Sequence, residues 1–289
     1  YKEFTDMIHK HGANIIMQIA YGGFMTRFNV GERTIWGPST MQDEVNKTWA
    51  KEMTKEDIKT LIKAHADAAL RVKKAGFDGV EIHCAHGYLL SQFLSPYFNK
   101  RTDEYGGNIE NRGRIVFEIY EAIREKVGDD FPVLIKINSA DYVSEGGLTQ
   151  EDSLYVAKKL ANLGIDAIEV SGGNGSIKEV VENNLAASRT KVVMSKDNES
   201  YFKDYAAKLA DEVDIPVILI GGNRHVDVME DILNNTKIEY FSLARPLTAE
   251  PDLVNIWASG DLKKPKCVSC NQCYTTEGKR CILNIRDKK

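Results

Sequence analysis

Short apolar runs alternate along this chain with longer stretches in which apolar residues recur every three or four positions. The short runs have the length of buried strands, and the longer stretches have the period of amphipathic helices. The runs predict six strands, at residues 14–19, 79–83, 133–138, 167–171, 217–221 and 240–244. Helices between them are predicted at 55–75, 113–127, 150–163 and 200–212. This alternation is typical of an α/β protein with a parallel sheet, either open or closed into a barrel.

The number of strands leaves the shape of the sheet open. A closed (β/α)8 barrel has two more strands than the pattern predicts. The chain also begins inside a helical pattern, since Tyr1, Phe4, Met7 and Ile8 share one face at helical spacing. The segment 26–48 is long for a loop after a strand, and we expect it either to shape a pocket or to form an irregular surface excursion.

Composition narrows the class of protein. Of 289 residues, 43% are hydrophobic and 28% are charged, which is ordinary for a globular domain. The net charge of -4 gives no electrostatic reason to expect nucleic acid as a partner. No apolar run approaches the roughly twenty residues that span a membrane, and no secretory signal is visible. We therefore expect neither a membrane-spanning nor a secreted protein, and a cytoplasmic location.

The predicted strand at 79–83 runs directly into the sequence His83-Cys-Ala-His86-Gly-Tyr88. Two imidazoles and a phenol thus gather at the end of a core strand, which is where α/β barrels carry their active sites. These groups can hydrogen-bond an oxyanion and deliver a proton. Two other interpretations are open: histidines that cap the core and bond to the backbone, or a zinc pair, although no third ligand is obvious nearby.

A long motif covers the same region. It reads His-Cys-Ala-His-Gly-Tyr-Leu-Leu-Ser-Gln-Phe-Leu-Ser-Pro over 83–96 and Asn-Lys-Arg-Thr-Asp-Glu-Tyr-Gly-Gly over 99–107. This sequence resembles the old yellow enzyme family of FMN-dependent ene-reductases, in particular the branch with 2,4-dienoyl-CoA reductase, 2-enoate reductase and trimethylamine dehydrogenase. The resemblance extends from about Gln18 to the last cysteine.

The resemblance implies a TIM (β/α)8 barrel in which the opening helix precedes the third strand. On that basis this sequence is expected to lack the first two β/α units, with an open six-stranded α/β sheet as the alternative. Residues 1–262 would form the FMN-binding barrel and 263–289 a separate cysteine-rich segment. The chain has Tyr-Gly-Gly-Phe at 21–24 where the family tends to have His-Ala-Gly-Arg, so we expect the substrate pocket to differ.

The resemblance also implies roles for individual residues. His83 and His86 would hydrogen-bond the carbonyl oxygen of an α,β-unsaturated substrate, and Tyr88 would protonate its α carbon. Gln18 would contact the pyrimidine edge of FMN, and Lys136 would place a positive charge beside flavin N1 and O2. A lysine among the apolar residues of a buried strand needs a partner in any case, because an unpaired buried charge is costly.

Two strand ends near residues 221 and 245 have the pattern of a phosphate site. In barrel register they follow strands seven and eight, whose loops commonly bind phosphate through backbone N–H groups. We expect the FMN phosphate and the adjoining mouth to be lined by Ser171, Gly172, Gly221, Gly222, Asn223, Ala244 and Arg245. By itself this pattern would identify only a phosphate-binding barrel.

Four of the five cysteines, Cys267, Cys270, Cys273 and Cys281, lie close together near the end of the chain. Their spacing suits a [4Fe–4S] cluster, which the related branch holds with a longer last gap. Zinc in a four-cysteine site is the alternative, and a segment without metal is the third possibility. The fifth cysteine, Cys84, is expected to be a packing residue. Close spacing without a secretory context favours a reducing compartment.

The expected function is that of an FMN-dependent oxidoreductase that reduces the activated C=C bond of an enone, enoate or enoyl thioester. Related enzymes carry a second nucleotide-binding domain after the cysteines, whereas this chain ends at residue 289. Electrons are therefore expected from NAD(P)H or from a carrier protein such as ferredoxin. The rival hypotheses are a phosphate-binding TIM-barrel lyase or isomerase with a structural zinc, and an inactive truncated barrel. The sequence leaves open the choice of alkene and whether the chain forms a homo-oligomer.

Overall fold

The structure, a computed structural model, describes residues 1–183, 191–193 and 195–286. Within these ranges, six parallel strands form one sheet in their order along the chain. They are β1 (Ile16–Ile19), β5 (Gly79–Cys84), β6 (Val133–Asn138), β7 (Ala167–Ser171), β8 (Val217–Leu219) and β9 (Tyr240–Phe241). All six predicted strands are present, with ends that differ from the prediction by a few residues.

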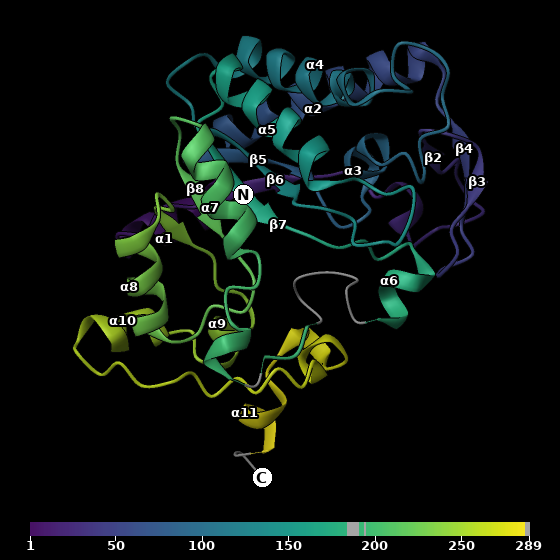
Figure 1. Ribbon diagram of the computed structural model, residues 1–289. Coiled ribbons are helices and arrows are strands. Elements are labelled where there is room, and N and C mark those ends of the chain that lie inside the picture. Colours follow the sequence, from purple (N-terminus) through teal and green to yellow (C-terminus); the bar gives the residue numbers. More distant parts are fainter. Residues whose placement is uncertain (184–190, 194, 287–289) are drawn as a thin grey trace.

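Helices alternate with these strands along the chain (Figure 1). They are α1 (Lys2–Lys10), α2 (Lys55–Lys74), α3 (Leu89–Leu94), α4 (Ile109–Val127), α5 (Gln150–Leu163), α6 (Lys178–Glu182), α7 (Lys203–Glu212), α8 (Val226–Asn235), α9 (Arg245–Ala249), α10 (Leu253–Ala258) and α11 (Ile282–Arg286). Single 3₁₀ turns lie at Gly23–Met25, Lys196–Asn198, Gln272–Tyr274 and Glu277–Lys279. In Figure 1, α2, α4 and α5 lie together beside β5 and β6, and the yellow C-terminal segment lies at the opposite end of the molecule.

Capping residues explain where the predicted helix boundaries were right or wrong. The helix predicted at 113–127 begins earlier, at Ile109, because the Asn108 side chain accepts a hydrogen bond from the Asn111 N–H at 3.0 Å and caps the first turn. The start of α2 agrees with the prediction, and there Thr54 and Asp57 form a capping box.

Side chains alternate across the central strands, and this alternation decides where polar groups lie. Val80 and Ile82 of β5 are fully buried in the core beneath the helices. The residues between them point to the other face of the sheet, which is the inner face of a barrel. On that face β5, β6 and β7 carry Glu81, Lys136 and Glu169 instead of apolar side chains.

The strand order is that of consecutive strands in a (β/α)8 barrel. In the part of the chain that the structure describes, this sheet has six strands, and the outer edges of β1 and β9 pair with no further strand. No helix in the same ranges is both long enough and apolar enough to cross a membrane.

The long segment after β1 contains a second, smaller sheet. Its strands are β2 (Trp36–Gly37), β3 (Met41–Gln42) and β4 (Trp49–Glu52), in the spatial order β2-β4-β3. β4 pairs in parallel with β2 and antiparallel with β3. The segment predicted as a pocket-shaping loop or an irregular excursion therefore has regular structure of its own.

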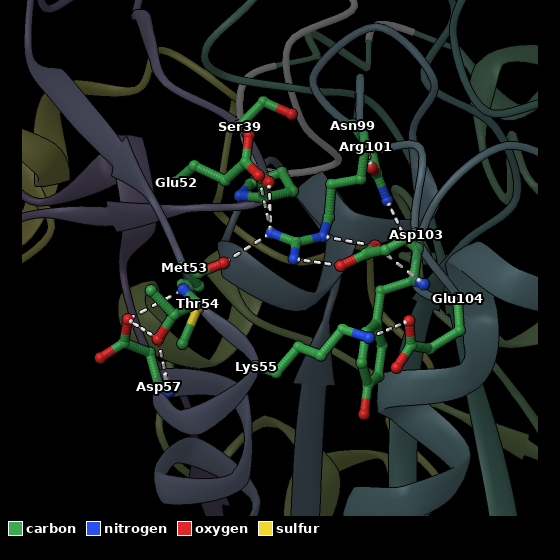
Figure 2. A network of polar contacts seen from close by, with 12 residues as sticks. Ser39, Glu52, Met53, Thr54, Lys55, Asp57, Asn99, Arg101, Asp103 and Glu104 are labelled. Carbon is green, nitrogen blue, oxygen red and sulfur yellow. Dashed lines mark hydrogen bonds and ion pairs between the residues drawn. The ribbon is translucent and has the colours of Figure 1, made fainter.

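Arg101 fastens this small sheet to the barrel (Figure 2). Its side chain is almost fully buried, and Nη1 donates to the carbonyl oxygens of Pro38 at 3.0 Å and Met53 at 2.7 Å. The other edge of the guanidinium forms a two-point ion pair with Asp103, in which Nε lies 2.9 Å from Oδ1. The Arg-x-Asp part of the motif at 99–107 is thus a structural clamp.

Candidate active site

Three aromatic side chains meet where β5 ends and α3 begins. The ring centroid of His83 lies 5.3 Å from that of His86 and 4.5 Å from that of Tyr88. His83 is buried, whereas His86 and Tyr88 are half-buried. The structure therefore brings the three predicted catalytic residues together at the carboxyl end of a central strand.

The backbone of His86 is held in an unusual conformation. Its φ of 62° lies in the left-handed region, which costs energy for a residue with a Cβ. The His86 N–H donates to Asn138 Oδ1 at 3.0 Å, and the ring Nε2 lies 2.7 Å from Ser171 Oγ. A backbone bridge joins His86 to Asn174. Because β6 and β7 supply these partners, two neighbouring strand ends fix the position of this imidazole.

Asp141 binds the two asparagines, Asn138 and Asn174, that contact the His86 segment. Its carboxylate is fully buried and accepts hydrogen bonds from the side-chain amides of Asn138 at 3.3 Å and Asn174 at 3.2 Å. The Leu148 N–H adds a third bond at 2.9 Å. Burial raises the pKa of the Asp141 carboxyl above its usual range. One buried carboxyl group therefore orients the side-chain amides of the two asparagines, Asn138 and Asn174, that hold the His86 segment.

A polar layer lies next to the histidines on the inner face of the sheet. Lys136 stands between His83 on β5 and Glu169 on β7 in the strand register. Its Nζ lies 2.7 Å from Glu169 Oε2 and 3.8 Å from Glu81 Oε2. The Gln18 amide donates to the same Glu81 oxygen from β1. Lys136, which was predicted to need a partner, therefore has two, and both predicted contacts of the flavin ring touch Glu81.

The charges in this layer interact strongly. Burial, and then the neighbouring Glu169 charge, raise the pKa of Glu81 to about 7. Burial opposes ionisation of Glu169 as well, but the Lys136 ammonium holds the pKa of Glu169 below its usual value. Despite its own burial, Lys136 has a raised pKa because two carboxylates face it. The layer therefore holds one stable ion pair and one carboxyl group that titrates near neutral pH.

The loops after β8 and β9 form a pocket. It is lined by Ile220, Gly221, Gly222, Asn223, Arg224, Ser242, Leu243, Ala244, Arg245 and Pro246. Gly221 and Gly222 have left-handed φ values of 124° and 86°, and a Cβ on Gly222 would lie 2.9 Å from the Tyr201 ring. Glycines with room only for backbone, next to guanidinium groups, fit a phosphate group. The residues predicted for the phosphate site in these two loops all line this one pocket.

Three of the residues predicted to contact FMN also make close contacts within the protein. Asn223 donates from Nδ2 to the carbonyl oxygens of Leu219 at 2.8 Å and Ser242 at 3.1 Å, which ties the end of β8 to β9. Gly172 packs so closely that a Cβ would lie 2.7 Å from both the Phe202 and Tyr142 rings. Ser171 and Gly172 are not among the residues that line the β8–β9 pocket. Ser171 contacts the His86 ring, and its predicted contact with FMN stays a prediction.

Two arginines connect the pocket between the β8 and β9 loops to the cysteine-rich segment. Arg245 donates to Asn271 Oδ1 and to the Lys191 carbonyl oxygen, both at 2.8 Å. Arg224 is almost fully buried and donates to the Cys267 carbonyl oxygen and to Ser269 Oγ, with Nη2 3.7 Å from Cys267 Sγ. The start of the cysteine-rich segment is therefore docked on the barrel beside the pocket.

The four clustered cysteines are only partly gathered. Cys267 and Cys281 are buried in one small apolar cluster with Ala249, whereas Cys270 is exposed. Burial, and then the thiols of Cys267 and Cys270, raise the pKa of Cys273. Over the described ranges, no three histidine, cysteine, aspartate or glutamate side chains form a group that could hold a metal ion. As they stand, the four thiols are not a complete ligand set.

Cys84 is fully buried, as expected of a packing residue, and burial strongly raises the pKa of its thiol. Sequence reasoning missed Glu81, Glu169, Asp141 and Arg224. For the two glutamates a signal was present, since each is a charge inside an apolar strand, which was the argument that singled out Lys136. For Asp141 and Arg224, which lie in loops, no comparable pattern exists.

Comparisons with known proteins agree with this geometry. The sequence profile of the NADH:flavin oxidoreductase / NADH oxidase family matches residues 1–262. An NADH oxidase from Thermoanaerobacter brockii is 35% identical over 288 residues, which cover 98% of this chain and 42% of that protein. A cinnamate reductase from Clostridium sporogenes is 32% identical over 287 residues, which cover 93% of this chain and 42% of that protein.

A solved structure agrees as well. A 2-naphthoyl-CoA reductase in complex with 2-naphthoyl-CoA superposes with a TM-score of 0.80 at 29% identity, over 94% of this chain and 42% of that one. This chain thus spans less than half the length of these three relatives. The chain belongs to the NADH:flavin oxidoreductase / NADH oxidase family, and its six parallel strands are strands of that family's TIM barrel.

Proposed function

We propose that this chain binds FMN and reduces the activated C=C bond of an α,β-unsaturated carbonyl compound with electrons from NAD(P)H. The observation that carries the proposal is the grouping of His83, His86 and Tyr88 at the end of β5, with Lys136 directly across the strand register. Family membership supports the flavin chemistry. The relatives named cinnamate reductase and 2-naphthoyl-CoA reductase support an aromatic enoate or acyl thioester as the substrate class.

Bound FMN would supply a hydride to the β carbon of the substrate. Negative charge would then develop on the carbonyl oxygen, and the imidazole N–H groups of His83 and His86 would donate hydrogen bonds to it. A preorganised donor of this kind is worth about 2.7–4 kcal/mol of transition-state stabilisation. The Tyr88 hydroxyl, beside the His83 ring, delivers the proton to the α carbon. Ser171 and Asn138 keep His86 in place for this task.

The residues present fit FMN at two positions. Gln18 on β1 and Lys136 on β6 lie on either side of β5 and both contact Glu81, so they offer an amide and an ammonium group that suit the polar edge of a flavin. The β8–β9 pocket offers glycine backbone and the Arg245 guanidinium for the phosphate. Arg245 would have to share its donors between the phosphate and Asn271.

For the cysteine-rich segment we propose a [4Fe–4S] cluster, with zinc as the alternative occupant. The support is the spacing of the four cysteines and the burial of Cys267 beside Cys281. The sulfurs would have to move closer together for either metal, so no catalytic step is assigned to this site. The cysteine pattern supports a reducing, cytoplasmic location, and family resemblance supports a ferredoxin-like carrier as an electron donor. A homo-oligomer is a further proposal that size-exclusion chromatography of the purified chain tests.

The decisive experiment uses the full chain, purified without oxygen. Its absorption spectrum should show bound flavin, and the flavin should be bleached by NADH or NADPH and reoxidised by cinnamate or a simple enone. A colourless protein that binds neither FMN nor riboflavin would refute the proposal and favour a lyase or isomerase. Iron, sulfide and zinc analysis of the same sample decides the occupant of the cysteines, with Cys267→Ser as the matched variant.

A further inference from the structure

The polar layer of Gln18, Glu81, Lys136 and Glu169 has an unbalanced charge. It contains two carboxyl groups and one ammonium group, and the side chains of Glu81 and Glu169 are only 12% and 6% exposed. Barrel interiors are normally packed with branched apolar side chains. A buried charge that lacks a partner is costly, so the carboxylate that Lys136 pairs with less closely binds a proton more readily than an ordinary glutamate does.

The distances decide which carboxyl group takes the proton. Three groups face Glu81 from its neighbours: the Gln18 amide from β1, the Lys136 ammonium from β6 and the Glu169 carboxylate from β7. His83 follows on the same face of β5. Lys136 Nζ is 2.7 Å from Glu169 but 3.8 Å from Glu81, so the ion pair forms with Glu169. The Lys136 ammonium stabilises the Glu81 carboxylate less than it stabilises Glu169, so Glu81 is the carboxyl group that binds a proton more readily.

We propose that Glu81 takes up a proton when negative charge arrives beside Gln18 and Lys136, and that it thereby couples reduction of the flavin to proton uptake inside the barrel. This inference rests on the proposed function, because FMN is the group that would bring the charge. A like charge nearby disfavours ionisation of a carboxylate. Once Glu81 is neutral, Lys136 has one carboxylate fewer to balance and can compensate the new charge.

The step balances in atoms and charge. NAD(P)H gives up a hydride, which carries two electrons and one proton to the flavin. Water supplies a second proton, which forms an O–H bond on the Glu81 carboxylate. When the flavin passes the hydride to the alkene, that proton returns to water. Glu81 therefore acts on the potential of the flavin without touching the substrate, and it is a tuning residue.

The pKa of Glu81, which burial and Glu169 raise to about 7, places this exchange at neutral pH. An ordinary glutamate would be fully ionised there and would gain a proton only under a much stronger field.

The test is the reduction potential of FMN bound to the full chain, measured against pH for the wild type and for Glu81→Gln. Above about pH 7, the wild-type potential should fall with pH more steeply than that of Glu81→Gln, by about one additional proton per two electrons. Glu212→Gln, which changes an exposed glutamate paired with Lys158, is the matched control and should follow the wild type. Parallel profiles for the wild type and Glu81→Gln would overturn the inference.

The variant Glu169→Gln and infrared difference spectra test the same inference independently. In Glu169→Gln, Lys136 is free to pair with Glu81, so the bend in the profile should move to lower pH. Infrared difference spectra of the wild type at about pH 8 should show the carbonyl band of a protonated carboxyl group when the flavin is reduced. Absence of that band contradicts the inference even if Glu81→Gln fails to fold. A chain that binds no FMN removes the proposed function and this inference together, whereas bound FMN with no linked proton removes only the inference.

Discussion

His86 and Ser171 lie 85 positions apart in the sequence, yet the imidazole Nε2 is 2.7 Å from the serine hydroxyl oxygen. The contact connects the loop after β5 to the last residue of β7. Ser171, which was predicted to contact FMN, therefore helps to fix the orientation of the His86 ring. Because the hydrogen bond at one ring nitrogen influences which nitrogen carries the proton, Ser171 also influences which N–H faces the substrate.

Replacing Ser171 by alanine should therefore impair chemistry more than flavin binding. Loss of one hydrogen bond, worth about 0.5–1.5 kcal/mol, should lower kcat for alkene reduction by roughly two- to tenfold. The dissociation constant of FMN, measured by fluorescence titration, should stay within about twofold of the wild type. The opposite pattern, weak FMN binding with normal kcat, would return Ser171 to the flavin site. Ser171→Thr retains the hydroxyl and serves as the conservative variant.

Tyr88→Phe should separate the two halves of the proposed reaction. The variant keeps the ring that packs on His83 but lacks the proton donor. Reoxidation of the flavin by an enone should slow by about 10²–10⁴-fold, the usual range for loss of a general acid. Reduction of the flavin by NAD(P)H needs no such proton and should keep its rate. Stopped-flow measurement of each half-reaction checks this, and equal loss in both would indicate a damaged site.

Sequence reasoning succeeded where the signal is local. The six strands follow from short apolar runs, and His83, His86 and Tyr88 lie within six consecutive residues. The glycines and Arg245 of the β8–β9 pocket were found because each lies within a few residues of the end of a strand. Strand ends were less accurate: β8 stops at Leu219, before the predicted end at 221, because the chain turns there to form the pocket.

The missed features depend on register between strands that are far apart in the sequence. Glu81 and Glu169 face Lys136 only because β5, β6 and β7 pair in one particular register. A shift by one residue would have placed each charge against the helices. Arg224 could not be identified because its partners lie more than forty residues away in a segment without regular strands. Local patterns carry no information on such contacts.

Gly222→Ala should weaken FMN binding through the phosphate pocket. The added methyl would lie 2.8 Å from Val193 and 2.9 Å from Tyr201, and the residue would be held at a φ of 86°. We expect an affinity loss of about fivefold to about a hundredfold, since overpacking costs about 1–3 kcal/mol. Gly128→Ala is the matched control, because its φ of 76° is similar but no atom lies within 4 Å of the new methyl.

Comparing FMN with riboflavin tests whether Gly222→Ala acts through the phosphate. Riboflavin lacks the phosphate, so its affinity should change less than that of FMN in Gly222→Ala. If both ligands lose affinity equally, the pocket does not hold the phosphate and another site must be sought.

Arg101→Met should destabilise the protein strongly, although the residue lies outside the proposed active site. The change leaves the Asp103 carboxylate and two carbonyl groups without their donor (Figure 2). Breaking a buried ion pair in this way costs about 3–5 kcal/mol. Lys55→Met removes the exposed pair between Lys55 and Glu104, at 2.8 Å in the same region, and should cost no more than about 1 kcal/mol. Urea unfolding of both variants checks the difference, and similar losses would show that Arg101 is not a clamp.

The raised pKa of Glu81 predicts a specific dependence of stability on pH in the protein without flavin. A carboxyl group whose pKa is higher in the folded state binds its proton more tightly there, so folding gains stability at low pH. That gain is complete below pH 4.5, the pKa of glutamate in a model peptide, and is lost as pH rises through about 7.

Asp103 acts in the opposite sense, because its hydrogen bond to Arg101 lowers its pKa. Its contribution to stability is lost only as the pH falls below the ordinary pKa of an aspartate. The free energy of unfolding should therefore decline between about pH 5 and pH 8 in the wild type and decline less in Glu81→Gln, which has no proton to lose. Equal slopes in the two proteins would mean that Glu81 ionises normally inside the fold and that the charge of the layer is balanced in another way.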